Sequence, residues 1–267
     1  SLHLGHAFSA LTAWDRAVAA GGRFLLRIED IDGPRCRPEF EQAIYDDLAW
    51  LGIAWEEPVM RQSERLPAYA AALDHLAARG LTYPCSCTRA DIRAALSAPQ
   101  ETGVQGPDGP VYPGTCRGRP MSDRRPGDAM RLDLARALAV TGPIRFAETG
   151  PENAGTHALS AQKMVAETGD IVLARKDIGT SYHMSVVVDD AAQGITEVVR
   201  GIDLFAATPI HVLLQRLLGF PSPRYHHHRL IRDESGMRLA KRDDARAIRH
   251  YRETGHSPEQ VRAMVGL

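Results

Sequence analysis

Three stretches in the first third of the chain carry apolar side chains along one helical face. In each stretch apolar positions recur every three or four residues, and a glycine follows the last of them. We therefore predict amphipathic helices over residues 7–20, 37–52 and 66–80.

A short apolar run, RFLLRIED at residues 23–30, lies between the first two helices and predicts a strand. Acidic residues follow at its end, with Glu29 and Asp30 and then Asp32. Helices and strands that alternate with short connections are typical of a parallel α/β sheet, and such sheets bind ligands at the carboxyl ends of their strands. The pattern therefore predicts a parallel α/β core.

The pattern changes in the middle of the chain. A segment rich in proline, glycine and arginine predicts an insertion with little regular structure. Apolar strands are expected again over 171–204, followed by a buried helix over 209–219 and by basic helical sequence. These changes divide the chain into four predicted parts: the first half of the core domain (1–82), the insertion (83–128), the second half of the core domain (129–220), and a loop with C-terminal helices (221–267).

The composition is that of an ordinary globular protein, with 44% hydrophobic and 24% charged residues among 267. The formal net charge of -1 means that any nucleic-acid surface has to be local. The sequence shows no apolar run long enough for a bilayer, no secretory leader pattern, and too few cysteines for a disulfide scaffold. We therefore expect a cytoplasmic protein that does not contact membranes.

Two histidines, His3 and His6, flank Gly5 where the first predicted helix begins. Helix-surface histidines without a role are the commonest explanation of such a pair, and a metal site is disfavoured because no third ligand is near. A phosphate site has a mechanism, because a helix N-terminus offers unpaired N–H groups and a positive dipole end to an anion. Gly5, which lacks a Cβ, would let a flat base approach the backbone.

A second basic element, RLAKR at residues 238–242, follows a Glu-Ser-Gly turn. Its Lys241 could reach a polyphosphate and stabilise the charge that develops as pyrophosphate leaves. A solvated basic face beside Asp243 and Asp244 is the alternative. The combination of RLAKR with the paired histidines favours a nucleotide site.

Together these motifs resemble those of the class I aminoacyl-tRNA synthetases. HLGH at residues 3–6 is similar to the HIGH motif of that family, and RLAKR is similar to its KMSKS loop. LLRIEDID, VVVDD and EVVRGIDL narrow the resemblance, which extends over nearly the whole chain, to the glutamyl group. The short C-terminal end and the cysteine-containing insertion are similar to the stand-alone catalytic paralogues that place glutamate on the queuosine base of the tRNA(Asp) anticodon.

The resemblance implies a fold and an activity. The fold is a Rossmann-like parallel-sheet catalytic domain with a zinc-containing insertion and a short helical C-terminal part. The activity is ATP-dependent activation of L-glutamate to glutamyl-adenylate, and transfer of the glutamate to tRNA(Asp) carrying queuosine, by a monomer. His3, His6 and Lys241 would be catalytic, and ATP with its Mg²⁺ would be bound by these three residues together with Gly5 and Arg238.

Glutamate needs a guanidinium for its side-chain carboxylate and a carboxylate for its ammonium group. By match to the glutamyl motifs, Arg200 takes the first role, Glu29 takes the second, and Tyr182 lines the same pocket. From the residues alone, other roles are about equally supported. Arg200 could be a buried ion-pair partner of Asp203, Glu29 a helix cap, and Tyr182 a core aromatic.

Three further groups of residues stay open at this stage. Asp189 and Asp190 follow an apolar run, as turn residues often do after a strand. The histidines at 226–228 point to alternate sides of the backbone, so we assign them no catalytic role. Contacts to a tRNA backbone or simple solubility would explain the remaining basic residues: Arg117, Arg119, Arg124, Arg125, Arg246 and Arg249.

Three of the four cysteines fall in the insertion, at Cys85, Cys87 and Cys116, which is one ligand short of a tetrahedral zinc site. The resemblance implies that Tyr112 completes a structural Zn²⁺ site, and zinc can lower the pKa of a phenol as it does that of other ligands. His157 is a physical alternative for the fourth ligand. Three reduced thiols without metal are also possible, but an insertion with little core of its own favours a metal.

One feature of the glutamyl family is absent from this sequence. In that family a strand of the type RFAPSPTG precedes the HIGH motif and contacts the amino acid, whereas this sequence starts two residues before His3. A central strand is hard to lose while the fold is kept. We therefore expect a truncated form, in which the glutamate site described above is incomplete.

Three other functions fit part of the pattern. A fragment of an ordinary glutamyl-tRNA synthetase would share the first reaction step but would charge the 3' end of a tRNA. A small-molecule nucleotidyltransferase would share the histidine motif but does not explain RIEDID and EVVRGID. A non-catalytic zinc-dependent tRNA-binding module would show no ATP turnover, which the intact histidines and Lys241 disfavour.

Overall fold

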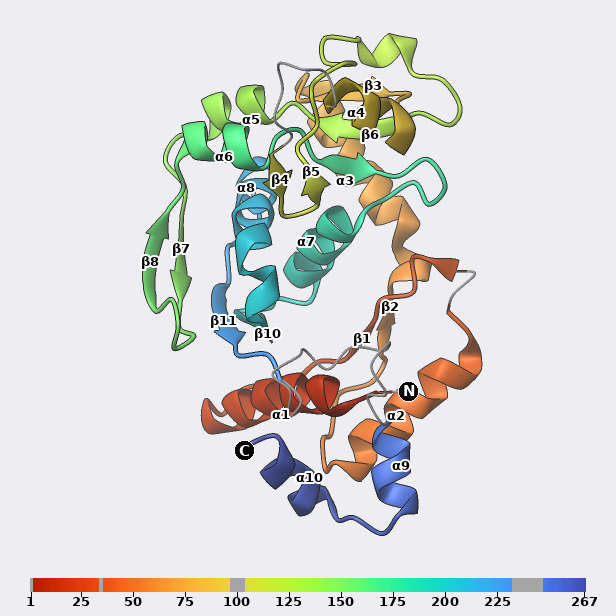
Figure 1. Cartoon of the computed structure of the whole chain (residues 1–267), viewed down its shortest axis with the longest axis vertical. Coiled ribbons are helices and arrows are strands. Elements are labelled where there is room, and N and C mark those ends of the chain that lie inside the picture. The colour runs from red at the N-terminus through yellow and green to blue at the C-terminus, as the bar shows by residue number, and fades with distance from the viewer. Residues whose placement is uncertain (1, 34–35, 97–103, 232–246) are drawn as a thin grey trace.

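The structure is a computed structural model that describes residues 2–33, 36–96, 104–231 and 247–267 (Figure 1). The α-helices are α1 (Leu4–Ala19), α2 (Pro38–Trp50), α3 (Leu66–Ala78), α4 (Arg89–Leu96), α5 (Leu134–Thr141), α6 (Ala161–Glu167), α7 (Tyr182–Ala192), α8 (Thr208–Leu218), α9 (Ile248–Glu253) and α10 (Pro258–Met264). Short 3₁₀ segments are η2 (Gln62–Arg65), η3 (Met121–Asp123) and η4 (Ile202–Ala207). The strands are β1 (Arg27–Ile28), β2 (Met60–Arg61), β3 (Thr82–Cys85), β4 (Gln105–Gly106), β5 (Gly109–Pro110), β6 (Ala129–Leu132), β7 (Arg145–Glu148), β8 (Gly155–Ala158), β9 (Val172–Ala174), β10 (Glu197–Gly201) and β11 (Arg224–His228).

The strands form parallel pairings in two separate places. β10, β11 and β7 run parallel in one sheet, with Arg200 of β10 opposite His227 of β11, and β8 lies antiparallel to β7. β1 and β2 form a second parallel pair. β3, β6 and β9 form an antiparallel sheet, and β4 and β5 form a hairpin. The predicted α/β class with parallel strands and helices is confirmed, although the parallel strands do not form one continuous sheet.

Residues 182–192 correct one prediction, because they form α7 instead of a strand. Ser181 caps this helix by accepting a hydrogen bond from the backbone N–H of Met184 at 3.3 Å. Every residue from His183 to Asp189 is buried, so the apolar run shows no periodic polar face. A short apolar run cannot distinguish a buried helix from a strand. The strand predicted over 23–30 is also shorter than expected, since only Arg27–Ile28 is paired.

The insertion is more regular than the sequence predicts. β3 pairs with β6 over its whole length, α4 follows the first two cysteines, and the β4–β5 hairpin packs against the end of α6. A Cβ added to Gly106 in this hairpin would lie 2.6 Å from the Glu167 carbonyl oxygen, so the close approach requires glycine. The position of the hairpin against the core is therefore set by backbone packing.

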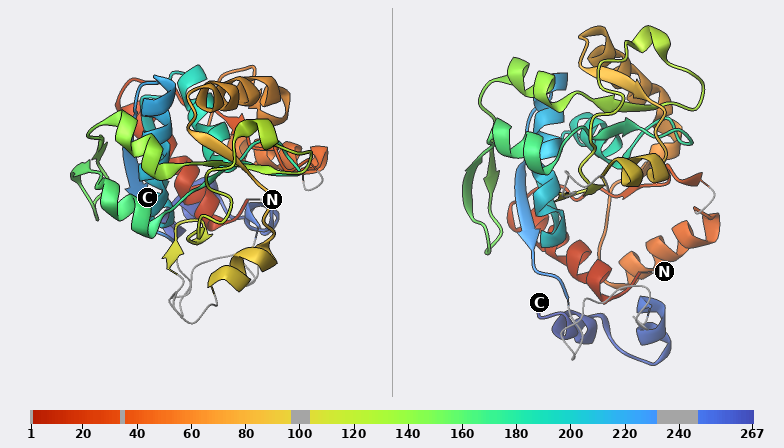
Figure 2. Two further views of the ribbon diagram at one scale, coloured as in Figure 1. Left: turned by 90° about the horizontal axis from the view of Figure 1, so that it is seen from above. Right: turned by 45° about the horizontal axis from the view of Figure 1, so that its top comes forward.

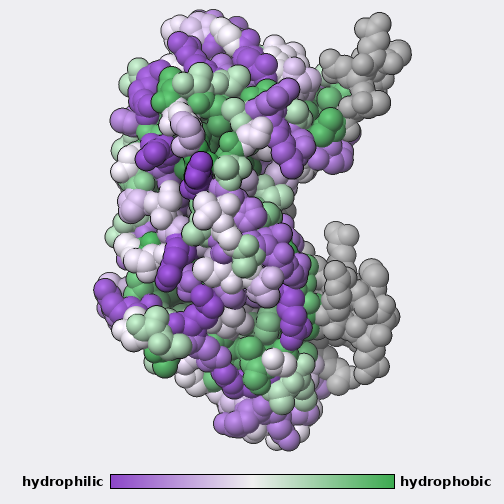
Figure 3. Space-filling model, turned by 90° about the vertical axis from the view of Figure 1, so that its left-hand side faces the viewer, coloured by the Kyte–Doolittle hydropathy of each residue, from purple (hydrophilic) through white to green (hydrophobic). Residues whose placement is uncertain are grey.

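Two apolar clusters hold the molecule together. The larger one joins α3, α7 and α8 to the β3–β6–β9 sheet and includes Tyr69, Leu132, Met184 and Leu213. The smaller one packs α1 and α2 against α9 and α10, so the two ends of the chain lie in the same part of the molecule (Figures 1 and 2). Viewed from the side, the outline is hollowed between that part and the end with β3 and β6 (Figure 3).

Within the described residues, no helix combines the length and the apolar character needed to cross a bilayer.

A core substitution on α8 tests this packing. Leu213 is 0% exposed, and Leu213→Ala should lower the free energy of unfolding by about 2–5 kcal/mol because it leaves a cavity. Val140→Ala, at a residue that is 55% exposed, should change it by less than about 0.5 kcal/mol. Urea unfolding followed by circular dichroism measures both values. Equal losses in the two variants would contradict the assigned core.

Candidate active site and metal centre

The first turn of α1 is organised by the two histidines. His3 is the N-cap, its Nδ1 accepts a hydrogen bond from the Gly5 N–H at 3.1 Å, and His6 Nδ1 accepts one from the His3 N–H at 3.2 Å. The ring centroids are 3.7 Å apart. A Cβ on residue 5 would lie 3.0 Å from the His3 ring, so Gly5 permits this geometry. The histidines therefore have a capping role at the helix end where an anion would bind.

Segments from opposite ends of the chain meet at this helix terminus. His3 forms an antiparallel bridge with Ala247, and the Ile248 N–H donates to the Leu2 carbonyl at 2.8 Å. Ile231 is buried against Phe8 on α1. Arg238 and Lys241 lie outside the described residues, but the residues that flank their segment, Ile231 and Ala247, both contact the start of the chain.

Glu29, Tyr182 and Arg200 come together near the start of α7. Burial raises the pKa of the Tyr182 hydroxyl, the Arg200 guanidinium lowers it by charge and hydrogen bonding, and the Glu29 carboxylate raises it. The three side chains are therefore within electrostatic reach of one another. The structure thus brings together the residues that the family resemblance assigns to glutamate.

Arg200 is 8% exposed and is surrounded by neutral acceptors. Its Nε donates to His227 Nε2 at 3.1 Å, its Nη1 contacts His211 Nδ1 at 2.9 Å, and its Nη2 donates to Thr208 Oγ1 at 2.8 Å. A longer contact of 3.4 Å joins Nη2 to the Leu204 carbonyl. Among the described residues, no carboxylate forms an ion pair with this guanidinium.

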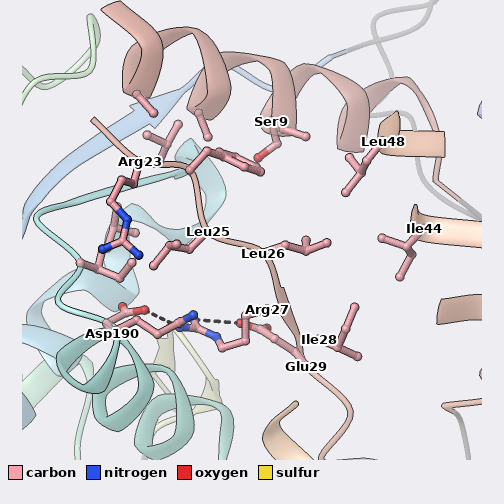
Figure 4. A pocket seen from close by; sticks show the side chains of 18 of the residues that line it. Ser9, Arg23, Leu25, Leu26, Arg27, Ile28, Glu29, Ile44, Leu48 and Asp190 are labelled. Carbon is pink, nitrogen blue, oxygen red and sulfur yellow. Dashed lines mark hydrogen bonds and ion pairs between the residues drawn. The ribbon is translucent and has the colours of Figure 1, made fainter. Parts of the chain in front are cut away.

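Arg27 connects Glu29 to α7 (Figure 4). Its Nη1 donates to Asp190 at 2.8 Å and to Gln193 at 2.9 Å, and its Nη2 donates to Glu29 at 3.3 Å. Burial raises the pKa of the Glu29 carboxyl group, and the charge of Arg27 opposes this shift. Asp190 is therefore an ion-pair partner on a helix and not a turn residue after a strand.

A cavity of about 1290 Å³ lies beside these charged groups (Figure 4). Residues of β1 and β10 line it, although these strands are not paired with each other. Leu25, Leu26 and Ile44 give it an apolar wall, while Arg27 and Glu29 give it a charged one. Arg200 and Tyr182 are not among the lining residues, so the cavity adjoins the group at α7 without enclosing it.

Four donor atoms converge in the insertion. The Sγ atoms of Cys85, Cys87 and Cys116 lie within 4.8 Å of one another. The Tyr112 hydroxyl lies 3.4 Å from Cys85 Sγ and 3.3 Å from Cys87 Sγ. Burial raises the pKa of the Cys116 thiol, but hydrogen bonds from Tyr112, Ser86 and Cys87 outweigh this effect and lower it to about 6. The three thiols supply three of the four ligands of a tetrahedral zinc site, and the Tyr112 hydroxyl lies in contact with two of them.

His157 does not join this cluster. Its Nε2 contacts the Asn153 carbonyl at 2.7 Å, and its ring packs against Phe146 and Phe205. Arg131 is the nearer neighbour, since it donates to Cys85 Sγ at 3.4 Å and lies 3.8 Å above the Tyr112 ring. The geometry therefore favours Tyr112 over His157 as the fourth donor.

Two arginines of the insertion make ion pairs within the protein. Arg117 pairs with Asp170 at 2.7 Å, and Arg119 pairs with Asp128 at 3.0 Å. Arg249 on α9 pairs with Glu253, and Arg246 lies outside the described residues. Two of the candidates for tRNA contact thus have a structural role in the insertion.

Sequence reasoning missed several residues near Arg200. It gave His227 no role, and it did not single out Arg27, His183 or His211. Their types are chemically informative, but each sits in an element that is buried for packing reasons, and nothing in the local pattern indicates which group it meets.

Comparisons with known proteins agree with this geometry. The whole chain, residues 1–267, matches the family of tRNA synthetases class I (E and Q), catalytic domain. It is also similar to a solved glutamate tRNA ligase from Elizabethkingia meningosepticum in complex with its amino acid, with a TM-score of 0.77 and 25% identity. That match covers 100% of this chain and spans 58% of the solved one. The chain belongs to the class I tRNA synthetase family of the E and Q type, and it is a ligase of that family.

Within this family, the similar proteins point to one kind of member. A protein of Rhodobacter capsulatus named glutamyl-Q tRNA(Asp) synthetase is 58% identical, over 100% of this chain and 96% of its own length. A protein of the same name from Symbiobacterium thermophilum is 42% identical, over 98% of this chain and 80% of its own length.

Asp189 offers a test of how α7 is held. This carboxylate is fully buried and accepts hydrogen bonds from Gln62 at 2.9 Å, Arg65 at 2.6 Å and Tyr69 at 2.7 Å. Asp189→Leu should lower the free energy of unfolding by about 3 kcal/mol, because Arg65 loses its partner. Thermal and urea unfolding measure the loss.

The matched control is the exposed pair of Arg175 and Asp177, whose side chains are 47% and 60% exposed. Asp177→Leu should cost less than about 1 kcal/mol. A loss in Asp189→Leu no larger than in this control would contradict the anchoring role of Asp189.

Proposed function

We propose that this protein activates L-glutamate with ATP and transfers it to the queuosine base in the anticodon of tRNA(Asp). The observation that supports this most strongly is the full-length similarity to proteins named glutamyl-Q tRNA(Asp) synthetase. The grouping of Glu29, Tyr182 and Arg200 gives the first step a physical basis. We also predict that the active protein is a cytoplasmic monomer.

In the first step, an oxygen of the glutamate α-carboxylate attacks the α-phosphorus of ATP. The bond to the bridging oxygen breaks, and pyrophosphate leaves with Mg²⁺ on its phosphates. Lys241 by its charge, and His3 and His6 by hydrogen bonds from Nε2, stabilise the transition state, with Gly5 and Arg238 at the nucleotide. Little proton chemistry is needed from the protein, so positioning and electrostatics supply most of the acceleration.

Glutamate is held by charge at both ends. Glu29 binds the ammonium group, and Arg200 with the Tyr182 hydroxyl binds the side-chain carboxylate. His227, His211 and Thr208 already occupy three N–H groups of Arg200. A bidentate interaction with the substrate carboxylate therefore requires Nη2 of Arg200 to exchange its 3.4 Å contact with the Leu204 carbonyl for a hydrogen bond to the substrate.

In the second step, a hydroxyl group of the tRNA nucleoside attacks the activated carbonyl carbon, and AMP leaves. An ordinary glutamyl-tRNA synthetase would share the first step and use the terminal adenosine as acceptor. A non-catalytic tRNA-binding module would share neither step. The names of the relatives favour queuosine as the acceptor.

We assign structural Zn²⁺ to the cluster of Cys85, Cys87, Cys116 and Tyr112. When bound, zinc supplies a cross-link between β3 and the segment that carries Tyr112 and Cys116. The chain needs such a link there because the apolar cluster of the insertion consists mainly of the donor residues themselves.

Pyrophosphate exchange tests the reaction. The protein should catalyse glutamate-dependent exchange between ATP and pyrophosphate, and mass spectrometry of nuclease-digested tRNA should place glutamate on queuosine. Label on the terminal adenosine would contradict the proposed acceptor in favour of the ordinary synthetase. Complete absence of exchange, with and without tRNA, would contradict activation itself.

Arg200→Ala tests the glutamate site. It should raise the KM for glutamate by about 100-fold or more, because it removes one partner of a desolvated charged pair. Arg216→Ala, at an exposed arginine on α8, is the matched control and should leave the KM unchanged. An unchanged KM in Arg200→Ala would place the substrate carboxylate elsewhere.

Metal analysis tests the zinc centre. The purified protein should contain one zinc ion per chain by plasma mass spectrometry, and Cys87→Ser and Tyr112→Phe should lose most of it and melt at a lower temperature. Cys36→Ser is the control, because Cys36 is exposed and apart from the cluster. Full zinc content in Tyr112→Phe would exclude the phenolate as a ligand.

A further inference from the structure

A chain of buried polar side chains runs from Arg200 to the hairpin of the insertion. His211 on α8 and His183 on α7 are 2% and 5% exposed. Their rings are joined by a 2.8 Å contact between His183 Nδ1 and His211 Nε2. The other nitrogen of His183 contacts Asp108, between β4 and β5, at 2.6 Å. Two buried imidazoles thus connect the guanidinium to a carboxylate that is half exposed.

The direction of every hydrogen bond in the series from Arg200 to Asp108 follows from the fact that the Arg200 guanidinium can only donate. A guanidinium only donates and stays protonated in proteins, so His211 Nδ1 must accept from Nη1. His211 then carries its proton on Nε2 and donates it to His183 Nδ1. His183 in turn carries its proton on Nε2 and donates it to Asp108. One donor at the centre therefore sets the tautomers of two histidines.

A second chain leaves Arg200 in the other direction. Its Nε donates to His227 Nε2, so His227 carries its proton on Nδ1 and donates it to Glu148 at 2.5 Å. Glu148 also accepts from the backbone N–H groups of Gly150 and His227. Both chains thus end at a carboxylate, and neither carboxylate touches the guanidinium.

The neutral state of the imidazoles is supported by their surroundings. Burial lowers the pKa of His211 well below its usual value, and the charge of Arg200 lowers it further. Burial also lowers the pKa of His227, and its hydrogen bond to Glu148 opposes this shift. Because the groups that hydrogen-bond to Arg200 are neutral, no carboxylate in contact cancels its positive charge, which stays available to a carboxylate from outside.

We propose that His211 and His183, ending at Asp108, are positioning residues that orient the Arg200 guanidinium for a substrate carboxylate and link its position to the insertion. This inference rests on the proposed role of Arg200 in binding glutamate. It assigns the β4–β5 hairpin a function: Asp108 holds the outer end of the chain, and the close backbone contact at Gly106 keeps the hairpin against the core.

A purely structural role for the histidines predicts a different outcome from a positioning role. Loss of packing would lower the free energy of unfolding and would change both kcat and KM. Loss of orientation would weaken an interaction that is present in both the bound substrate and the transition state, so the KM for glutamate should rise while kcat changes little.

The decisive variants are at His211. His211→Leu removes the acceptor and should raise the KM for glutamate by about 10–100-fold, with kcat within about 3-fold of the parent. His211→Asn places an oxygen near the former Nδ1 and should recover most of the affinity. Leu214→Val, on the same buried helix, is the matched control and should lower the melting temperature without changing the KM.

A variant at the exposed end keeps the test independent of folding. Asp108→Ala removes the carboxylate at which the hydrogen-bond series through His211 and His183 ends. Because Asp108 lies on a surface hairpin, the variant should fold, and it should raise the KM for glutamate by about 3–10-fold. Asp108→Asn retains an acceptor and should lie between Asp108→Ala and the parent. An unchanged KM in both His211→Leu and Asp108→Ala would overturn the proposal, as would an effect confined to kcat.

The tautomers supply a readout that does not depend on the substrate. In protein with ¹⁵N-labelled histidine, ring nitrogen shifts at neutral pH should show His183 and His211 protonated at Nε2 and His227 protonated at Nδ1. A different set of tautomers would contradict the proposed series of hydrogen bonds even if the protein is active. Absence of glutamate-dependent exchange in the parent, with these tautomers present, would overturn the proposed function and leave the hydrogen-bond chain in place.

Discussion

A buried positive charge that has only neutral hydrogen-bond partners is the constraint on which the centre of this protein depends. Burial of a guanidinium is costly unless its N–H groups are satisfied, and a carboxylate in contact would satisfy them most simply. At Arg200, imidazoles and a hydroxyl do so instead. The parallel register of β10 and β11 sets Arg200 opposite His227, and α8 supplies His211 and Thr208. The core is thus arranged so that this charge keeps its attraction for an anion.

The insertion is held by contacts of three different kinds, two of them to the core and one within the insertion. β3 and β6 are joined by backbone hydrogen bonds, Cys85, Cys87, Cys116 and Tyr112 converge on one point, and Asp108 contacts His183. Arg131 lies over the Tyr112 ring and donates to Cys85, where it would offset the negative charge of three thiolates and a phenolate around a divalent ion. A segment with few apolar residues of its own is held by directional contacts.

The two ends of the chain are brought together by a separate cluster. α9 and α10 pack on α1 and α2, and the bridge between His3 and Ala247 lies beside the histidine pair. Motifs that are more than two hundred residues apart in the sequence, HLGH and RLAKR, are thereby connected through the residues that flank the second one. The proposed ATP site needs this arrangement, because its charged groups come from both ends.

The sequence by itself predicted the helices whose burial is one-sided and the three cysteines that the structure brings together. The periodicity of α1, α2 and α3 was sufficient to predict them, α8 was predicted as a buried helix that ends before Gly219, and the three cysteines were enough to indicate a metal site. α7 was predicted as a strand because it is buried on all sides, which removes the polar face that reveals a helix. The tertiary structure alone decided which polar groups meet: His183 with His211 across 28 positions, His183 with Asp108 across 75, and Arg27 with Asp190 across 163. The physical reason is that patterning reports how each residue partitions between water and core, whereas a hydrogen bond between distant residues depends on how whole elements pack.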